Sequence, residues 1–128
     1  MGNDSHPPPL HEAEEEIMEA VWARGEASIR EVMEDVNAKA EKPRAYTTFM
    51  SVMARLDRKG LLVRRREGKT DIYRPAFSRD EYVDRRAQTE VASLVDQFGD
   101  VALGHFARQM ADLDPDRRRA LQRLARKS

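Results

Sequence analysis

The sequence of 128 residues contains no cysteine. This absence excludes disulfide bonds, zinc sites with cysteine ligands and thiol redox switches. The sequence also lacks any apolar run approaching the about 18 residues that a membrane-spanning helix needs, and its first residues do not show the basic and then apolar order of a signal peptide. We therefore expect a cytoplasmic protein without a membrane partner.

Patterns typical of catalysis or cofactor binding are also missing. The three histidines, His6, His11 and His105, are scattered, and no glycine-rich phosphate loop, nucleophile motif or pair of acids stands out. His11 and Glu15 have the i, i+4 spacing of two metal ligands, but an ordinary helix start with surface acids has the same spacing. We therefore expect no enzyme, no cofactor and no metal site.

The formal net charge is zero, but the charges are distributed unevenly along the chain. Residues 1–43 carry 4 basic and 11 acidic side chains, residues 44–74 carry 9 and 3, and residues 75–128 carry 10 and 9. A short basic block of this kind is typical of a segment that contacts phosphates. The alternative is a solvated charged surface, which does not by itself explain the segregation.

Three helices are predicted in the first half of the chain. Residues 1–9, with three consecutive prolines, are expected to form a disordered tail. The first helix follows this tail and ends at Gly25, and the second begins at the capping box that Ser28 and Glu31 form. The third covers residues 46–59, after which glycine ends the pattern.

A basic hairpin is predicted after these helices. Residues 61–66 and 71–74 are short β-compatible runs on either side of Gly68, which permits the positive φ of a tight turn. Three helices followed by such a hairpin is the order of a winged helix-turn-helix, for which we expect residues 10–76. Residues 77–128 are predicted to form three more helices. The expected fold class is mainly α with a small β-hairpin, a winged helix-turn-helix followed by a C-terminal three-helix dimerisation region.

The third helix has one apolar and one polar face. Small hydroxyl side chains on the polar face allow a helix to approach base edges, and arginines can read guanine or hold phosphate. The candidate DNA-binding residues on and just before this helix are Arg44, Tyr46, Thr47, Thr48, Ser51, Arg55 and Arg58. Alternatives stay open, with the two threonines as caps, the serine as a solvated position and the tyrosine as half-buried packing.

The hairpin adds five cations within 11 residues, which are Arg64, Arg65, Arg66, Lys69 and Arg74. A strand tip beside the groove that the third helix occupies can reach the phosphate backbone. Strand alternation places Arg64 and Arg66 on one face and Arg65 on the other, so at least one of these three is a candidate for a merely solvated position.

The apolar residues of the second half also recur at helical spacing. The candidate dimer-interface residues are Val83, Ala87, Val91, Leu94, Val95, Phe98, Phe106, Leu121 and Leu124. A three-helix tail has too little surface of its own to bury every apolar stripe, so pairing of two chains is the economical solution. The alternative for the stripe over residues 83–98 is an internal core.

Three stretches of the sequence resemble a known family. They are LHEAEEEIMEAVWARGEASIREV, AYTTFMSVMARLDRKGLL and REGKTDIYRPAFSRDEYV, which are similar to the penicillinase-repressor family, the BlaI and MecI repressors with their copper-responsive CopY relatives. The resemblance covers residues 10–82 densely and the last 46 residues loosely. It depends on the ordered occurrence of short motifs, among them Trp22, the Tyr46-Thr47-Thr48 triplet and the Lys59-Gly60 pair.

The resemblance implies a homodimeric repressor of a dyad operator, with the third helix in the major groove and the hydroxyls of Thr48 and Ser51 on its DNA side. Two departures limit what it implies about release from DNA. The C-terminal cysteine cluster of CopY-type proteins is absent. The Asn-Phe bond at which staphylococcal-type members are cleaved is matched here by His105 and Phe106, so the inducing signal and any upstream sensor system stay unknown.

The leading functional hypothesis is a transcriptional repressor that binds double-stranded operator DNA as a homodimer. One alternative is a winged-helix module whose basic hairpin docks an acidic protein partner. Another is a ligand-responsive regulator with a small-molecule pocket in its helical half, although no motif marks such a pocket.

Overall fold

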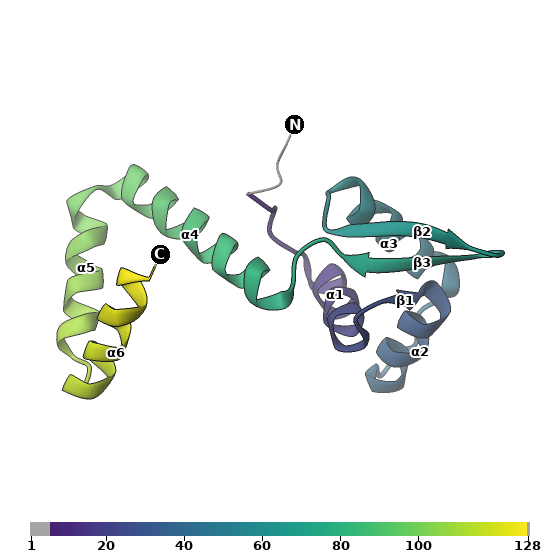
Figure 1. Ribbon diagram of the computed structural model, residues 1–128, viewed down its shortest axis with the longest axis horizontal. Coiled ribbons are helices and arrows are strands. Elements are labelled where there is room, and N and C mark those ends of the chain that lie inside the picture. The colour runs from purple at the N-terminus through teal and green to yellow at the C-terminus, as the bar shows by residue number, and fades with distance from the viewer. Residues whose placement is uncertain (1–5, 128) are drawn as a thin grey trace. The chain divides into compact units, whose positions relative to one another are not determined.

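The computed structural model describes residues 6–127 (Figure 1). The chain divides into two compact units, Met1–Ala87 and Gln88–Ser128. The boundary between them falls inside one helix, α4 (Arg79–Phe98). Within the described residues, no helix combines the length and the apolar character that crossing a membrane requires.

The helices of the first unit begin and end largely where local sequence signals predict. They are α1 (Glu12–Arg24), α2 (Ile29–Lys39) and α3 (Tyr46–Arg58). Gly25 follows α1 with a φ of 86°, which a residue with a Cβ rarely adopts. At the start of α2, the Ser28 hydroxyl accepts from the Glu31 N–H at 3.2 Å, and the Glu31 carboxylate accepts from the Ser28 N–H at 2.9 Å. The predicted capping box is confirmed.

A three-stranded antiparallel sheet completes this unit, with strand order β1-β3-β2. The hairpin of β2 (Leu62–Glu67) and β3 (Thr70–Pro75) turns at Gly68, which has a φ of 62°. The third strand, β1 (Ala27–Ser28), pairs with Ile72 and Tyr73 and was not predicted. Two residues are too few to show the alternation by which a strand is recognised.

The core of the unit lies between the helices and the sheet. Phe49, Val52, Met53 and Leu56 of α3 are buried, as the periodicity predicted. They pack with apolar residues of α1, α2, the three strands and the segment before β2, which are Ile17, Met18, Val21, Ala27, Ile29, Val32, Val36, Leu61, Leu62 and Tyr73. One face of α3 is therefore committed to packing, and the other is left for contacts outside the chain.

The beginning of α4 is attached to the first unit. The Trp22 indole N–H donates to the Phe77 carbonyl at 2.8 Å, and the Trp22 and Tyr82 ring centroids lie 5.6 Å apart. The Tyr82 hydroxyl donates to the carbonyl of Pro8 at 3.1 Å, and Pro7 is buried. Of the expected disordered tail, residues 1–5 lie outside the described residues, whereas residues 7 and 8 contact α4.

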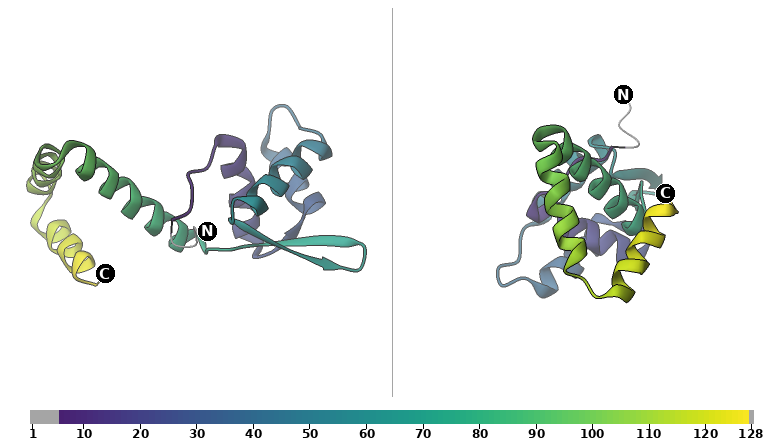
Figure 2. Two further views of the ribbon diagram at one scale, coloured as in Figure 1. Left: turned by 90° about the horizontal axis from the view of Figure 1, so that it is seen from above. Right: turned by 90° about the vertical axis from the view of Figure 1, so that its left-hand side faces the viewer.

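The second unit contains the end of α4 together with α5 (Asp100–Ala111) and α6 (Pro115–Arg126), and α5 and α6 run in opposite directions (Figures 1 and 2). Asp114 caps α6 by accepting from the Arg117 N–H at 2.9 Å. Among the described residues of α4, α5 and α6, only Ala102 is buried. The apolar stripes of these helices therefore have no internal core to occupy.

Candidate nucleic-acid interface

The exposed face of α3 lies opposite its buried residues. Successive helical residues are about 100° apart, so the direction opposite the four buried residues is centred on Thr47, Ser51, Ala54 and Arg58. Three of these side chains are exposed and Ala54 is half-buried. Thr47 does not cap the helix, because the N-cap is Ala45 and no side chain forms a cap hydrogen bond there. The threonine is available for contacts outside the chain.

A shallow groove runs between this face and the hairpin. It is lined by residues of α3, including Ser51 and Arg58, and by Arg64 and Asp71 of the strands. Figure 2 shows α3 lying alongside the hairpin. Arg58 forms no ion pair with any residue that the structure describes, and the nearest carboxylate oxygen to Arg64 is that of Asp71, at 3.9 Å. Arg58 thus lies beside Ser51 without an ion-pair partner among the described residues, and Arg64 forms only a long ion pair with Asp71.

Arg55 points toward α1. Its Nε atom donates to Oε2 of Glu14 at 2.8 Å, and the Lys59 ammonium donates to the same oxygen at 2.8 Å. The Glu14 side chain is fully buried, whereas 43% of the Arg55 side chain is exposed. The sequence placed Arg55 on the DNA-binding face, and the structure places it at the edge of that face in an ion pair.

The surroundings of Glu14 hold it in the charged state. Burial alone raises the pKa of the carboxyl, but a hydrogen bond from the His11 N–H and the bonds from Lys59 and Arg55 outweigh it. The resulting pKa is about 2, against an ordinary value of 4.5. A carboxylate that accepts hydrogen bonds from three groups in this way holds α1 against the C-terminal end of α3.

The three consecutive arginines of β2 occupy different surroundings. Arg65 donates to both carboxylate oxygens of Glu26, at 2.9 and 2.8 Å, and to Glu67 at 2.7 Å. These bonds raise the pKa of Arg65 and lower that of Glu26. Arg66 pairs with Asp71 at 2.9 Å. Arg65 is therefore held by two acids on the strand face away from Arg64, in agreement with the expected alternation.

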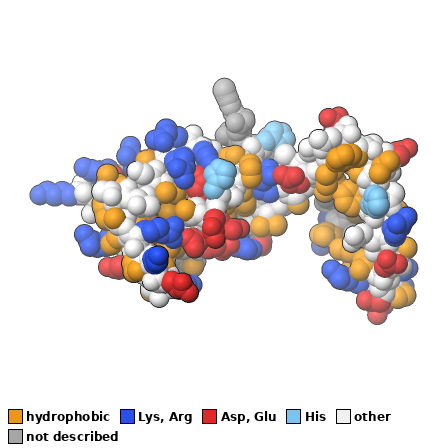
Figure 3. Space-filling model, turned by 180° about the vertical axis from the view of Figure 1, so that it is seen from behind, with side chains coloured by type: hydrophobic (Ala, Val, Ile, Leu, Met, Phe, Trp, Pro, Cys, Tyr) orange, Lys and Arg blue, Asp and Glu red, His pale blue; other side chains and the backbone are white. Residues whose placement is uncertain are grey.

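The other two basic residues of the hairpin, Lys69 and Arg74, are exposed and form no ion pair within the described part of the chain. Seen from behind, basic side chains gather at the end of the molecule where the hairpin projects (Figure 3). Acidic side chains form a separate patch. The charge segregation along the sequence thus becomes a segregation in space.

The entry to α3 is fixed by polar contacts. The Asn37 side chain donates to the Arg44 carbonyl at 2.9 Å and accepts from the Arg44 N–H at 3.0 Å. The Arg44 guanidinium pairs with Glu16, so this cation is already partnered. The Tyr46 ring is 40% exposed and lies 5.8 Å from the guanidinium of Arg30.

Three residues at this surface were missed by sequence reasoning. Arg30 lies outside the basic block, in an acidic stretch of sequence, and nothing in the pattern relates it to Tyr46. Met50 and Ala54 line the groove beside Ser51, and neither was among the residues predicted to bind DNA. Their angular positions around the helix axis could have indicated this location, because they differ from those of the buried stripe.

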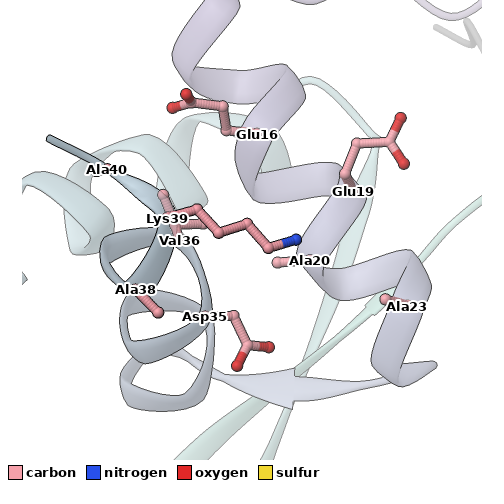
Figure 4. Close-up of a pocket in the computed structure, with 9 residues that line it drawn as sticks. All are labelled: Glu16, Glu19, Ala20, Ala23, Asp35, Val36, Ala38, Lys39 and Ala40. Atoms are coloured by element: carbon pink, nitrogen blue, oxygen red, sulfur yellow. The ribbon is translucent and has the colours of Figure 1, made fainter.

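A second hollow lies between α1 and α2, on surfaces that α3 does not line (Figure 4). Alanines form much of its wall, with Glu16, Glu19 and Asp35 at the edges. Each of these acids already pairs with an arginine, respectively Arg44, Arg79 and Arg24. Lys39 is the one basic side chain among the residues that line the hollow, so the hollow lacks the clustered cations that would match a nucleic acid.

Comparison with known proteins agrees with this geometry. The model of the penicillinase repressor family matches residues 10–127. The chain belongs to this family. It is a transcriptional regulator with a winged-helix domain, as the sequence predicted, and not an enzyme.

Individual relatives cover most of this penicillinase repressor. Proteins named transcriptional regulator BlaI from two strains of Mycobacterium tuberculosis are 33% identical over 118 residues, which are 90% of this chain and 84% of theirs. The solution structure of the DNA-binding domain of the repressor BlaI has a TM-score of 0.52 at 25% identity. That of Bacillus licheniformis BlaI, in monomeric form with the blaP half-operator, has a TM-score of 0.50 at 25% identity. Each covers 59% of this chain and 90% of the other.

Proposed function

We propose that this penicillinase repressor blocks transcription by binding a dyad-symmetric operator as a homodimer. The observation that carries the proposal is the outer face of α3, which exposes Thr47, Ser51 and Arg58 and carries no acid. A helix of this kind fits the major groove, where hydroxyls and arginines meet base edges. The solution structure of the similar B. licheniformis BlaI is described in complex with the blaP half-operator, which supports operator binding by this chain.

The hairpin would contact the DNA backbone beside the groove. Arg64 faces the same groove as Ser51, and Lys69 and Arg74 are exposed on the hairpin without acid partners among the described residues. These cations are suited to phosphates, which position a protein on DNA without reading sequence. We assign residues 10–76 to DNA binding on this basis, and residues 77–128 to dimerisation.

The dimer would bury the apolar stripes of the second half. On α4, Val91, Leu94 and Phe98 are 45%, 39% and 54% exposed. Exposed large apolar residues continue on the next two helices, with Val101, Leu103 and Phe106 on α5 and Leu124 on α6. The exposed apolar stripe of α4 is typical of a protein interface, and an isologous pair buries the same patch on both chains.

Sequence-specific, salt-dependent DNA binding tests the proposal. Wild-type protein should enrich one dyad sequence from a random duplex library, and its affinity should fall with salt by roughly one log-log unit per phosphate contacted. Ser51→Ala and Arg58→Ala should reduce the preference for the enriched sequence over random DNA by about tenfold or more. Lys39→Ala, in the hollow between α1 and α2, is the control and should keep the preference. Failure to enrich any sequence would favour the protein-docking alternative.

The hairpin arginines provide a matched pair of variants. Arg64→Ala should weaken binding to operator and random DNA alike, by about three- to tenfold, and reduce the salt slope by about one. Arg65→Ala removes the same charge from the same strand, but Glu26 and Glu67 already hold this side chain, so its effect should be smaller. Titrations of both variants at several salt concentrations measure the difference. Equal losses would show that both arginines contact phosphate.

A further inference from the structure

The outer face of α3 is not uniformly polar. Tyr46, Met50 and Ala54 follow one another at intervals of four residues and line the groove beside Ser51 and Arg58. Met50 is 48% exposed, although a thioether side chain of this size would be more stable in the core. These three residues therefore form an apolar strip along the side of the exposed face that borders the groove, where Arg58 and Arg64 also lie.

The neighbours of Met50 restrict what the strip can meet. The Tyr46 ring lies against Arg30 at one end, and Arg58 and Arg64 line the groove toward the other end. These cations favour an anionic partner, because they attract a negatively charged surface and repel a positively charged one. Ala54 has only a methyl group, so the partner can approach the helix closely at that point. The strip thus fits a partner that carries an apolar group and is otherwise negatively charged.

Thymine supplies such a group. In the major groove, thymine is the base that carries a methyl, at C5, and this methyl projects toward a bound helix. We propose that Met50, with Ala54 beside it, reads thymine in each half-site by packing against the C5 methyl. This proposal rests on the proposed function, since it requires α3 to enter the major groove. It adds a direct apolar readout to the hydrogen bonds expected from Ser51 and Arg58.

Removing the methyl from the DNA isolates this contact. The probe is the dyad duplex that wild-type protein enriches from a random library, prepared with deoxyuridine in place of each thymine in turn. Uracil retains every hydrogen-bonding group of thymine and lacks only the methyl. Wild-type protein should lose about fivefold in affinity at one thymine per half-site and remain unaffected by substitutions in the flanking sequence.

The protein variants complete the test. Met50→Ala should bind the thymine duplex about fivefold more weakly and lose nothing further on the uracil duplex, so the two losses are not additive. Met50→Leu retains an apolar side chain and should keep the preference for thymine. Ser51→Ala is the matched control, because it should weaken binding while keeping the thymine preference.

The outcomes separate the two proposals. If no sequence is enriched, the proposed function fails. If a sequence is enriched but uracil is tolerated at every position, or if Met50→Ala keeps the full thymine preference, the repressor assignment stands and the reading by Met50 is overturned.

Discussion

Replacing Glu14 by Gln should lower the free energy of unfolding by about 3 kcal/mol at pH 7. The carboxylate is fully buried and accepts from Arg55 of α3, from Lys59 directly after this helix and from the backbone of His11. The amide that replaces it has no charge to balance the two cations, and its NH2 group faces donors. Urea denaturation of the full chain at one fixed protein concentration measures the change.

The loss should depend on pH in one direction. The pKa of Glu14 is about 2 in the folded protein, below its ordinary value of 4.5. A lowered pKa of a carboxyl adds stability that is present above pH 4.5 and disappears as the pH falls toward 2. The difference between wild type and Glu14→Gln should therefore be largest near neutral pH and shrink steadily below about pH 4.5.

Glu15→Gln is the matched control for this experiment. Glu15 also lies in the first turn of α1 but is exposed, so its substitution removes the same interaction with the helix dipole without breaking a buried ion pair. We expect a change below about 0.5 kcal/mol. Equal effects of the two substitutions, or a constant difference between pH 7 and 3, would contradict the role assigned to Glu14.

The same ion pair explains where the sequence prediction of the site reached its limit. The candidates predicted on α3 included Thr47, Ser51 and Arg58, on which, with Ala54, the structure centres the outer face. Ala54 was not predicted, and the predicted Arg55 lies at the edge of this face. Arg55 is drawn to one side by a carboxylate 41 positions earlier in the chain. No pattern within α3 contains that information.

A signal for Glu14 itself was nevertheless present. The residue precedes Ile17, Met18 and Val21 at helical intervals of 3, 4 and 7, so it continues the buried stripe of α1. A charged residue at a stripe position indicates a buried partner of opposite sign. The identity of that partner required the tertiary structure, because it depends on how α1 crosses α3.

Features that depend on neighbouring residues in the sequence were predicted more completely than features that depend on tertiary contacts. The capping box at Ser28 depends on two residues three positions apart, and it is present in the structure. The hairpin turn at Gly68 depends on a single φ. By contrast, β1 exists only because β3 lies beside it, and the contact of Arg30 with Tyr46 depends on the angle between α2 and α3.

Replacing Leu94 by Glu should convert the proposed dimer to monomers. Leu94 lies between Val91 and Phe98 on one side of α4, and all three are exposed in the single chain. The substitution occurs twice in a symmetric dimer and places a carboxylate in an apolar seam on each side. Since desolvating an unpaired charge is costly, the dimer dissociation constant should rise by about 100-fold, which corresponds to about 3 kcal/mol. Sedimentation equilibrium measures it directly.

Ser93→Glu separates the effect of position from that of charge. Ser93 is exposed on the opposite side of the same helix, so this variant gains the same charge outside the stripe and should remain dimeric.

The two variants also test whether operator binding depends on dimerisation. A monomer contacts one half-site at a time, so Leu94→Glu should lose at least tenfold in affinity for the full dyad while its affinity for an isolated half-site stays the same. An unchanged mass for Leu94→Glu would show that this stripe is not the dimer interface, and the dyad affinity should then be unchanged as well.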